Sequence, residues 1–177
     1  MPTGAPRRQW GPGAPLAAHL CASPRTPPMT LAWTLQPFAA LSVPELYALL
    51  QLRSAVFVVE QTCAFQDIDG HDAEALHLLG RTETGELAAY ARLFPVGRSY
   101  PEASIGRVAV ALAFRRHGLG RQLMGEALAR CAAQWGPQPI QIGAQLYLRE
   151  FYRSFGFEQV GDEYLEDDIP HIHMLRP

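Results

Sequence analysis

Arg107-Val108-Ala109-Val110 and, four residues later, Arg115-Arg116-His117-Gly118-Leu119-Gly120 form the stretch that decides the fold. The first segment belongs to a predicted strand at residues 104–111, and the second opens a predicted helix. The apolar residues of that helix recur on a single stripe, as is typical of a helix packed on a sheet. They are Leu119, Leu123, Met124, Ala127, Leu128, Cys131 and Trp135.

This strand–turn–helix junction has the features of an anion-binding site. Gly118 and Gly120 let the backbone approach a ligand closely, and the first turn of the helix offers N–H groups without intrahelical partners. Arg116 and Arg121 flank the turn with positive charge. The pattern predicts a pyrophosphate-binding turn, and a tight junction that binds nothing is the plainer interpretation. A Rossmann fold is disfavoured because the third glycine of its fingerprint is missing.

The composition excludes several classes of function. All fifteen basic residues of the 177-residue chain are arginine, so a P-loop and lysine Schiff-base chemistry are excluded. The net charge of −2 gives no electrostatic sign of nucleic-acid or membrane binding. No apolar run reaches the ~18 residues of a membrane span. We expect a cytoplasmic protein with no nucleic-acid or membrane partner.

The cysteines and histidines indicate no disulfide framework and no metal site. Cys21, Cys63 and Cys131 are widely spaced and form no Cys-x-x-Cys pair. His171 and His173 share one face of a predicted strand but lack a clear third ligand.

The composition changes near Met29. Residues 1–28 hold seven of the fifteen prolines and no acidic residue. Such a stretch buries too little apolar surface to offset the entropy of ordering it. We therefore expect a disordered Pro-rich extension at residues 1–28 and one domain at residues 29–177.

The domain is predicted to alternate strands and helices. Ser42 and Glu45 have the spacing of a capping box at the start of a helix. Gly156 is predicted to close the last helix, at residues 148–155. The predicted order is β-α-β-β-β-α-β-α-β-β, an α/β fold in which helices flank a mixed sheet in a single domain.

The sequence of the decisive stretch resembles motif A of the GNAT N-acetyltransferases. Gln145, Tyr152 and the pair Gly156-Phe157 resemble the second cofactor-binding element of that family. Residues 46–53, 56–61 and 164–172 look like the ElaA-type branch. The resemblance covers about Leu31 to Leu175, and the fold it implies, a mixed sheet flanked by helices, agrees with the predicted order.

The resemblance implies that acetyl-CoA is the co-substrate. In the family, the motif A strand binds the pantetheine arm and the following turn binds the pyrophosphate. The implied cofactor-binding residues are Val108, Ala109, Val110, Arg115, Arg116, His117, Gly118, Leu119, Gly120 and Arg121, together with Gln145 near the thioester. Leu112 replaces a proline of many relatives, and Ile140 replaces a glutamate general base of some, so that base is absent.

Acyl transfer from a thioester to an amine needs an oxyanion site, a general acid and a route for the amine proton. A backbone N–H of residues 108–110, freed where two parallel strands splay apart, is expected to polarise the carbonyl. Tyr152 is the candidate acid because a tyrosine pKa of ~10 lies near that of a thiol. The alternative is that Tyr152 belongs to the core, since it shares a helix face with Leu148 and Phe155.

The general base stays open at this point. Glu60, Asp69, His77 and His171 are candidates, directly or through a water. A solvated loop explains Asp69 equally well, and a strand face explains His77. Two acidic groups, Asp67/Asp69/Asp72 and Glu166/Asp167/Asp168, are expected to be solvated loops that favour a cationic amine if they border the substrate entrance.

Three functions fit the residues. The first is an acetyl-CoA-dependent N-acetyltransferase that acts on a small-molecule or peptide amine. The second is an acyltransferase like the acyl-homoserine-lactone synthases, suggested by Arg53, Phe57 and the spaced aspartates. The third is a non-catalytic CoA-binding or sensing module, suggested by the glutamate missing at Ile140. Assembly into a homodimer stays open.

Overall fold

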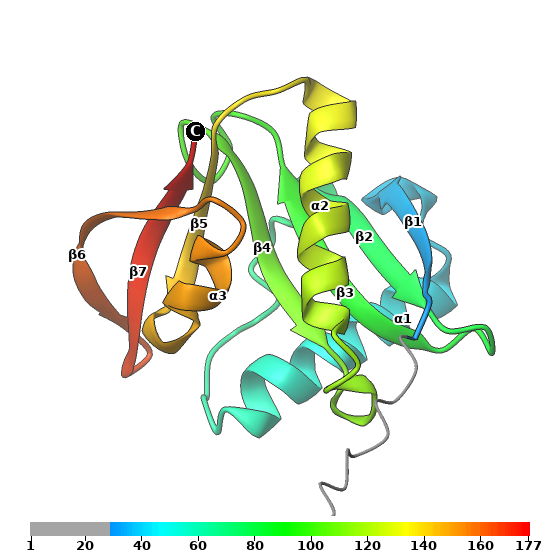
Figure 1. The fold of residues 1–177 in the computed structure, drawn as a ribbon. Coiled ribbons are helices and arrows are strands. Elements are labelled where there is room, and N and C mark those ends of the chain that lie inside the picture. Colours follow the sequence, from blue (N-terminus) through cyan, green and yellow to red (C-terminus); the bar gives the residue numbers. More distant parts are fainter. Residues whose placement is uncertain (1–28) are drawn as a thin grey trace, which may run out of the picture.

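The computed structural model describes residues 29–177, so the expectation for residues 1–28 lies outside the described residues. The strands are β1 (Ala32–Pro37), β2 (Leu76–Arg81), β3 (Leu87–Phe94), β4 (Ala103–Val110), β5 (Ile140–Gln145), β6 (Glu158–Glu166) and β7 (Ile169–Arg176). The helices are α1 (Val43–Arg53), α2 (Leu119–Trp135) and α3 (Arg149–Arg153). This order confirms the predicted one (Figure 1).

The strands form one sheet in the order β1-β2-β3-β4-β5-β7-β6. Within residues 29–177 only β4 and β5 are parallel, and they pair at two positions, Ala103 with Ile140 and Ser104 with Gln141. Beyond Ser104 the two strands diverge, as Figure 1 shows. The edge of β4 that faces away from β3 therefore has no strand partner from the described residues along positions 105–110.

Helix α1 begins at the predicted capping box. The Glu45 backbone N–H donates to Ser42 Oγ at 3.4 Å, and the Ser42 backbone N–H donates to Glu45 Oε2 at 2.9 Å. The helix continues into a π-helical segment, Ser54–Glu60, which carries the chain toward the open end of β4.

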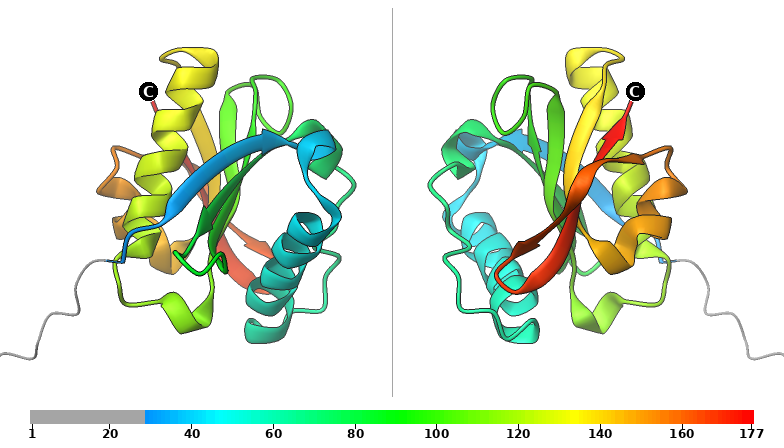
Figure 2. Two further views of the ribbon diagram at one scale, coloured as in Figure 1. Left: turned by 90° about the vertical axis from the view of Figure 1, so that its right-hand side faces the viewer. Right: turned by 90° about the vertical axis from the view of Figure 1, so that its left-hand side faces the viewer.

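A helix covers each face of the sheet, and the side chains of β2 and β3 point alternately toward one helix and the other (Figure 2). Leu78 and Ala89 face the core under α2, whereas their neighbours Leu79 and Tyr90 pack with Leu49 of α1. Successive strand residues point to opposite faces, so one buried strand supplies both cores. Helices α1 and α2 therefore pack on opposite faces of the sheet that contains the diverging strands β4 and β5.

Helix α3 is shorter than predicted. A 3₁₀ turn, Leu146–Leu148, precedes it, and the α-helical part ends at Arg153. The N–H of Phe155 bonds to the Tyr152 carbonyl and that of Gly156 to the Arg153 carbonyl, so the last turn tightens to i→i+3 spacing. Gly156 then takes a φ of +85° and ends the segment, as predicted.

Candidate active site

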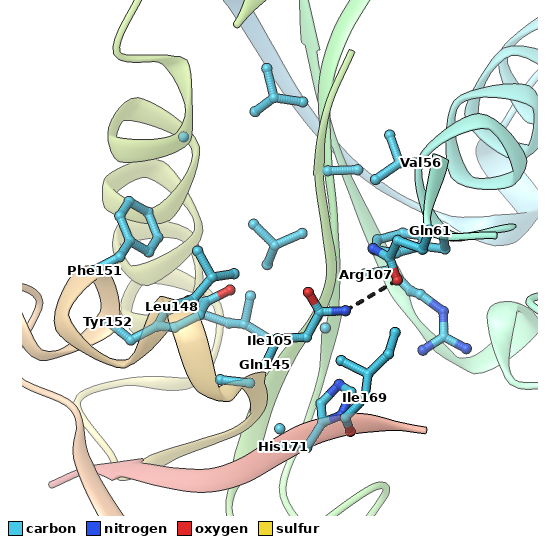
Figure 3. Close-up of a pocket in the computed structure, with 18 of the residues that line it drawn as sticks. Val56, Gln61, Ile105, Arg107, Gln145, Leu148, Phe151, Tyr152, Ile169 and His171 are labelled. Carbon is cyan, nitrogen blue, oxygen red and sulfur yellow. Dashed lines mark hydrogen bonds between the residues drawn. The ribbon is translucent and has the colours of Figure 1, made fainter. Parts of the chain in front are cut away.

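A cavity of about 690 Å³ opens where β4 and β5 diverge (Figure 3). Tyr152 lines it, and so do all but one of the predicted cofactor-binding residues. These are Val108, Ala109, Val110, Arg115, Arg116, Gly118, Leu119, Gly120, Arg121 and Gln145. The exception is His117, which is half-buried, does not line the cavity and has no partner for Nδ1 among the described residues.

The N-terminus of α2 lies at this cavity. Gly118 is the N-cap and has a φ of +75°, which disfavours any residue with a Cβ. The N–H groups of Arg121 and Gln122 bond to the Gly118 carbonyl. Among residues 29–177 no acceptor bonds to the N–H groups of Leu119 and Gly120. Two unpaired donors at a helix N-terminus suit an anion.

Three arginines of this turn have different surroundings. Arg115 donates from Nη1 and Nη2 to the Glu60 carboxylate at 2.6 and 2.7 Å, and from Nε to the Val110 carbonyl at 3.1 Å. Arg121 donates to Ser154 Oγ at 2.9 Å. Arg116 is exposed and makes no ion pair within the described part of the chain. Arg116 is therefore the guanidinium most available to a phosphate.

Strand β4 bends where its unpaired edge lines the cavity. Its register with β3 shifts between Tyr90 and Arg92, and Arg107 takes a φ of +49°. A non-glycine residue in this region costs about 1–3 kcal/mol and persists only when its surroundings fix it. Here Arg107 Nε donates to Asp67 Oδ1 at 2.7 Å, which anchors the bend from outside the strand.

Tyr152 belongs to the core and to the cavity at once. It is 6% exposed, and its ring packs edge-on against Phe151 and Phe157. Burial raises the pKa of Tyr152 to about 12, so the phenol is a weaker acid than its ordinary pKa predicts and stays protonated at neutral pH. No described residue hydrogen-bonds to its hydroxyl, which leaves that group free for a ligand.

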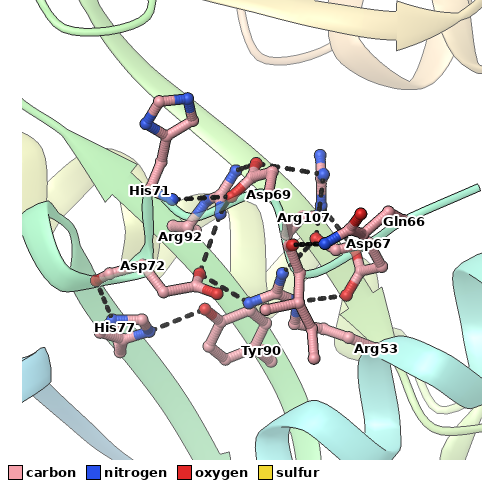
Figure 4. Close-up of polar contacts among 11 residues, drawn as sticks. Arg53, Gln66, Asp67, Asp69, His71, Asp72, His77, Tyr90, Arg92 and Arg107 are labelled. Carbon is pink, nitrogen blue, oxygen red and sulfur yellow. Dashed lines mark hydrogen bonds and ion pairs between the residues drawn. The ribbon is translucent and has the colours of Figure 1, made fainter.

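A buried cluster of charges lies beside the cavity. Arginines from α1, β3 and β4 meet aspartates of the segment that precedes β2 (Figure 4). The members of this Arg/Asp network are Arg53, Arg92, Arg107, Asp67, Asp69 and Asp72. Asp67 and Asp72 are buried, so the prediction that these acids form a solvated loop is wrong. Guanidinium groups distant in sequence compensate their burial.

Arg53 is the centre of the Arg/Asp network. Its side chain has no exposed surface, and it donates to Asp67 Oδ2 at 2.7 Å, to Asp72 Oδ1 at 2.7 Å and to the Asp67 carbonyl at 2.8 Å. The sequence did hold a signal for this role. Arg53 lies four residues after Leu49 on the buried side of α1, where a cation requires partners.

Two of the four candidate bases are carboxylates held by arginine. Hydrogen bonds from Arg115 lower the pKa of Glu60. Burial alone would raise the pKa of Asp69, but hydrogen bonds from Arg92 and the charges of Arg92 and Arg107 lower it well below its usual range. Asp69 also does not line the cavity. Both carboxylates are therefore poor proton acceptors.

The two histidines differ sharply. His77 has no exposed surface and does not line the cavity. Its Nε2 donates to the Asp72 carbonyl at 3.0 Å, and its Nδ1 accepts from the Tyr90 hydroxyl at 2.8 Å, which leaves no free nitrogen. His171 is half-buried, lies on β7 and lines the cavity.

The bonding of His77 predicts a pH dependence of stability. Burial, with the nearby charges of Arg53 and Arg92, lowers the pKa of His77 below its ordinary value. Between pH 7 and 5 the unfolded chain then binds more protons at this residue than the folded protein, so the free energy of unfolding should decrease as the pH falls. Urea denaturation at pH 7, 6 and 5 measures this decrease.

His77→Gln is the matched variant, because an amide supplies one neutral donor and one neutral acceptor. The decrease between pH 7 and 5 should become smaller in this variant. An equal decrease in both proteins would assign the effect to other groups.

Gln61, Tyr100 and Tyr164 also line the cavity but were not predicted from the sequence as site residues. Gln145 Nε2 donates to Gln61 Oε1 at 3.1 Å and so links β5 to the end of the π-helical segment (Figure 3). Tyr100 and Tyr164 also line the cavity, and a Cβ on Gly143 would lie 3.1 and 3.2 Å from their hydroxyl oxygens. The side chains of Gln61, Tyr100 and Tyr164 come from three separate segments, which no local pattern connects.

The second acidic group, Glu166/Asp167/Asp168, is exposed, and two of its residues border the cavity. Glu166 and Asp167 are exposed and line it beside Tyr164. Within residues 29–177 no group of three or more His, Cys, Asp or Glu side chains is placed to hold a metal ion. In the same range no helix has the length and apolarity needed to cross a membrane.

Comparison with known proteins identifies the family. The family model described as an acetyltransferase (GNAT) domain matches residues 50–176. Protein ElaA of Escherichia coli (strain K12) is 50% identical over 138 residues, which is 77% of this chain and 90% of ElaA. The crystal structure of Escherichia coli ElaA has a TM-score of 0.77 and 46% identity, and covers 84% of this chain and 100% of its own.

Two further solved structures resemble this chain, one in sequence and fold and the other in fold alone. A crystal structure of an acyl-CoA N-acyltransferase from Pseudomonas aeruginosa has a TM-score of 0.79 and 45% identity, covering 84% of this chain and 100% of its own. The acyl-homoserine-lactone synthase LasI has a TM-score of 0.66 at 14% identity over 83% of this chain and 89% of its own, which shows a shared fold alone. The chain therefore belongs to the GNAT family of acyltransferases and to its ElaA-like branch.

Proposed function

We propose that the protein transfers an acetyl group from acetyl-CoA to a primary amine by direct attack on the thioester. The observation that carries the proposal is the convergence of the α2 N-terminus, the unpaired β4 edge and Tyr152 on one cavity. The residues fit CoA, since a Cβ on Gly120 would meet only the Phe151 ring, at 3.8 Å, which leaves room above the free N–H groups.

Each group has a task in this reaction. A backbone N–H of residues 108–110 stabilises the oxyanion as the amine nitrogen attacks the carbonyl carbon. As the C–S bond breaks, the Tyr152 hydroxyl donates its proton to the departing sulfur. The high pKa of Tyr152 keeps the proton in place until the thiolate charge develops beside it.

The carboxylates at the end of β6 favour a cationic acceptor. The three aspartates of the Arg/Asp network are balanced by its three arginines, and Glu60 is paired with Arg115. Glu166 and Asp167 make no ion pair with the described residues, and their negative charge remains available to attract an amine in its ammonium form.

One assay separates this proposal from its alternatives. The protein is incubated with acetyl-CoA and a panel of primary amines, and free thiol is measured. Amine-dependent thiol release supports the N-acetyltransferase. Activity with acyl carrier protein thioesters but not with CoA thioesters would favour a synthase-like acyltransferase. Tight CoA binding without thiol release would favour a CoA-sensing module.

Gly120→Asp should lower CoA affinity at least tenfold, or about 1.4 kcal/mol. The new carboxylate would lie at the helix N-terminus, where the pyrophosphate is proposed to bind, and would repel it. The side chain has space, so the protein should stay folded. Isothermal titration calorimetry with CoA measures the effect.

Gly125→Asp is the matched control. Gly125 lies farther along α2, and a Cβ there has no neighbour within 4 Å. The same charge on the same helix should leave CoA affinity within twofold. Equal losses in the two variants would contradict the assignment of the pyrophosphate site.

A further inference from the structure

His171 occupies a central position at the cavity. In β7 it pairs with Gln145 of β5 on one side and with Tyr164 of β6 on the other. Its ring stacks on that of Tyr164, with 5.8 Å between the centroids. Figure 3 shows His171 and Tyr152 on different elements around the same cavity, with the Gln145 side chain also in it.

The hydrogen bonding of His171 fixes its tautomer. Nδ1 lies 2.8 Å from the Ile169 carbonyl oxygen, and a carbonyl only accepts. Nδ1 therefore carries the hydrogen, and in the neutral ring the lone pair is on Nε2. No described residue forms a hydrogen bond with Nε2. The atom is not buried, so it remains accessible to solvent.

The other candidates do not offer such an atom. Glu60 is held by two hydrogen bonds from Arg115. Asp69 is held by Arg92 and Arg107, and His77 is fully buried with both nitrogens bonded. Among ionisable side chains, histidine has the ordinary pKa, ~6.5, that best suits a base near neutral pH.

We propose that His171 is the general base, an inference that rests on the proposed acetyl transfer. The ammonium form of the acceptor first releases one proton to water. As the nitrogen of the neutral amine then forms its bond to the carbonyl carbon, one N–H proton passes to His171 Nε2. The C–S bond breaks, and sulfur takes the proton of the Tyr152 hydroxyl. Proton exchange with water returns the imidazolium and the phenolate to their neutral forms. The net products are one amide and one thiol.

Other ionisable groups lie near His171, and a pH profile must distinguish their titration from that of the imidazole. From β6 and the turn that follows it come Tyr164, Glu166, Asp167 and Asp168, and from β5 only the neutral amide of Gln145. On its own strand, His173 also stacks on the Tyr164 ring, with 4.6 Å between the centroids. The other charged residues that line the cavity are Glu60, Arg92, Arg107, Arg115, Arg116 and Arg121.

The test is the pH dependence of kcat/KM between pH 5 and 9, with acetyl-CoA and the most active amine of the panel. The wild-type protein should lose activity as the pH falls through the range in which histidine is protonated. His171→Gln should lower kcat/KM about 10²-fold and remove this acidic limb. CoA affinity, measured by calorimetry, should stay within twofold.

Two control variants identify the group that titrates. His173→Gln removes a neighbouring imidazole that does not line the cavity, and it should keep the acidic limb. Glu166→Gln removes a cavity carboxylate, and it should keep the limb as well. Loss of the limb in either control, with the limb intact in His171→Gln, overturns the proposal.

The remaining outcomes are also decisive. If His171→Gln does not fold, the imidazole of His171 in the wild-type protein is titrated by NMR. A midpoint that coincides with the acidic limb supports the proposal, and a midpoint more than one pH unit away overturns it. A wild-type protein that acetylates no amine refutes the proposed function and the base together, whereas an active wild type with an unchanged limb in His171→Gln refutes the base alone.

Discussion

Arg53→Met should lower the free energy of unfolding by about 3–5 kcal/mol, because it removes the cation that two buried carboxylates share. Asp67 and Asp72 would each lose a hydrogen bond of 2.7 Å and an ion pair. Methionine fills a similar volume with an apolar chain, so the loss measures charge compensation rather than a cavity. Urea denaturation at pH 7 gives the value.

Arg130→Met is the control for this variant. Arg130 pairs with Glu126 on the surface of α2 at 2.7 Å, and such exposed pairs contribute about 0–1 kcal/mol. A loss for Arg53→Met no larger than that for Arg130→Met would show that the buried carboxylates find other compensation.

Tyr152→Phe should lower kcat about 10²-fold and leave CoA affinity unchanged. The substitution removes one hydroxyl and keeps the ring, so the packing on Phe151 and Phe157 should survive. Stability should therefore change by less than ~1.5 kcal/mol. A thiolate leaves fairly well unaided, so a tenfold decrease also supports the assignment. Steady-state kinetics and a thermal melt together measure the two effects.

Tyr47→Phe is the control for the loss of a phenol. Tyr47 is exposed on α1 and does not line the cavity, so its substitution should leave kcat unchanged. An unchanged kcat in a stable Tyr152→Phe protein would restrict Tyr152 to the core and leave the thiolate to be protonated by water.

The order of elements and the turn at the α2 N-terminus could be predicted because local patterns determine them. The capping box at Ser42 and the glycine at position 118 act within a few residues of the chain. The splay of β4 and β5 was likewise expected from the family resemblance, and the pairing of only two residue pairs shows it.

The Arg/Asp network could not be predicted because its partners are distant in sequence. Arg107 is 40 positions from its partner Asp67 in the sequence, and Arg92 is 23 positions from its partner Asp69. An aspartate in a polar segment is usually exposed, and only the three-dimensional arrangement of three arginines reverses that expectation for Asp67. Gln61, Tyr100 and Tyr164 were not predicted for the same reason, because the residues near them in the cavity are distant in sequence.

The arginines of the cavity have a chemical consequence for a protein that handles thioesters. All the basic residues that line the cavity are arginines, of which Arg116 and Arg121 make no ion pair among residues 29–177, and the entire chain contains no lysine. A guanidinium stays protonated and has no free lone pair, whereas a lysine amine is itself a substrate for acyl transfer. Near the N-terminus of α2 the cavity can thus attract an anion without a side-chain amine that an activated acyl group would modify, so the protein is protected from lysine self-acylation.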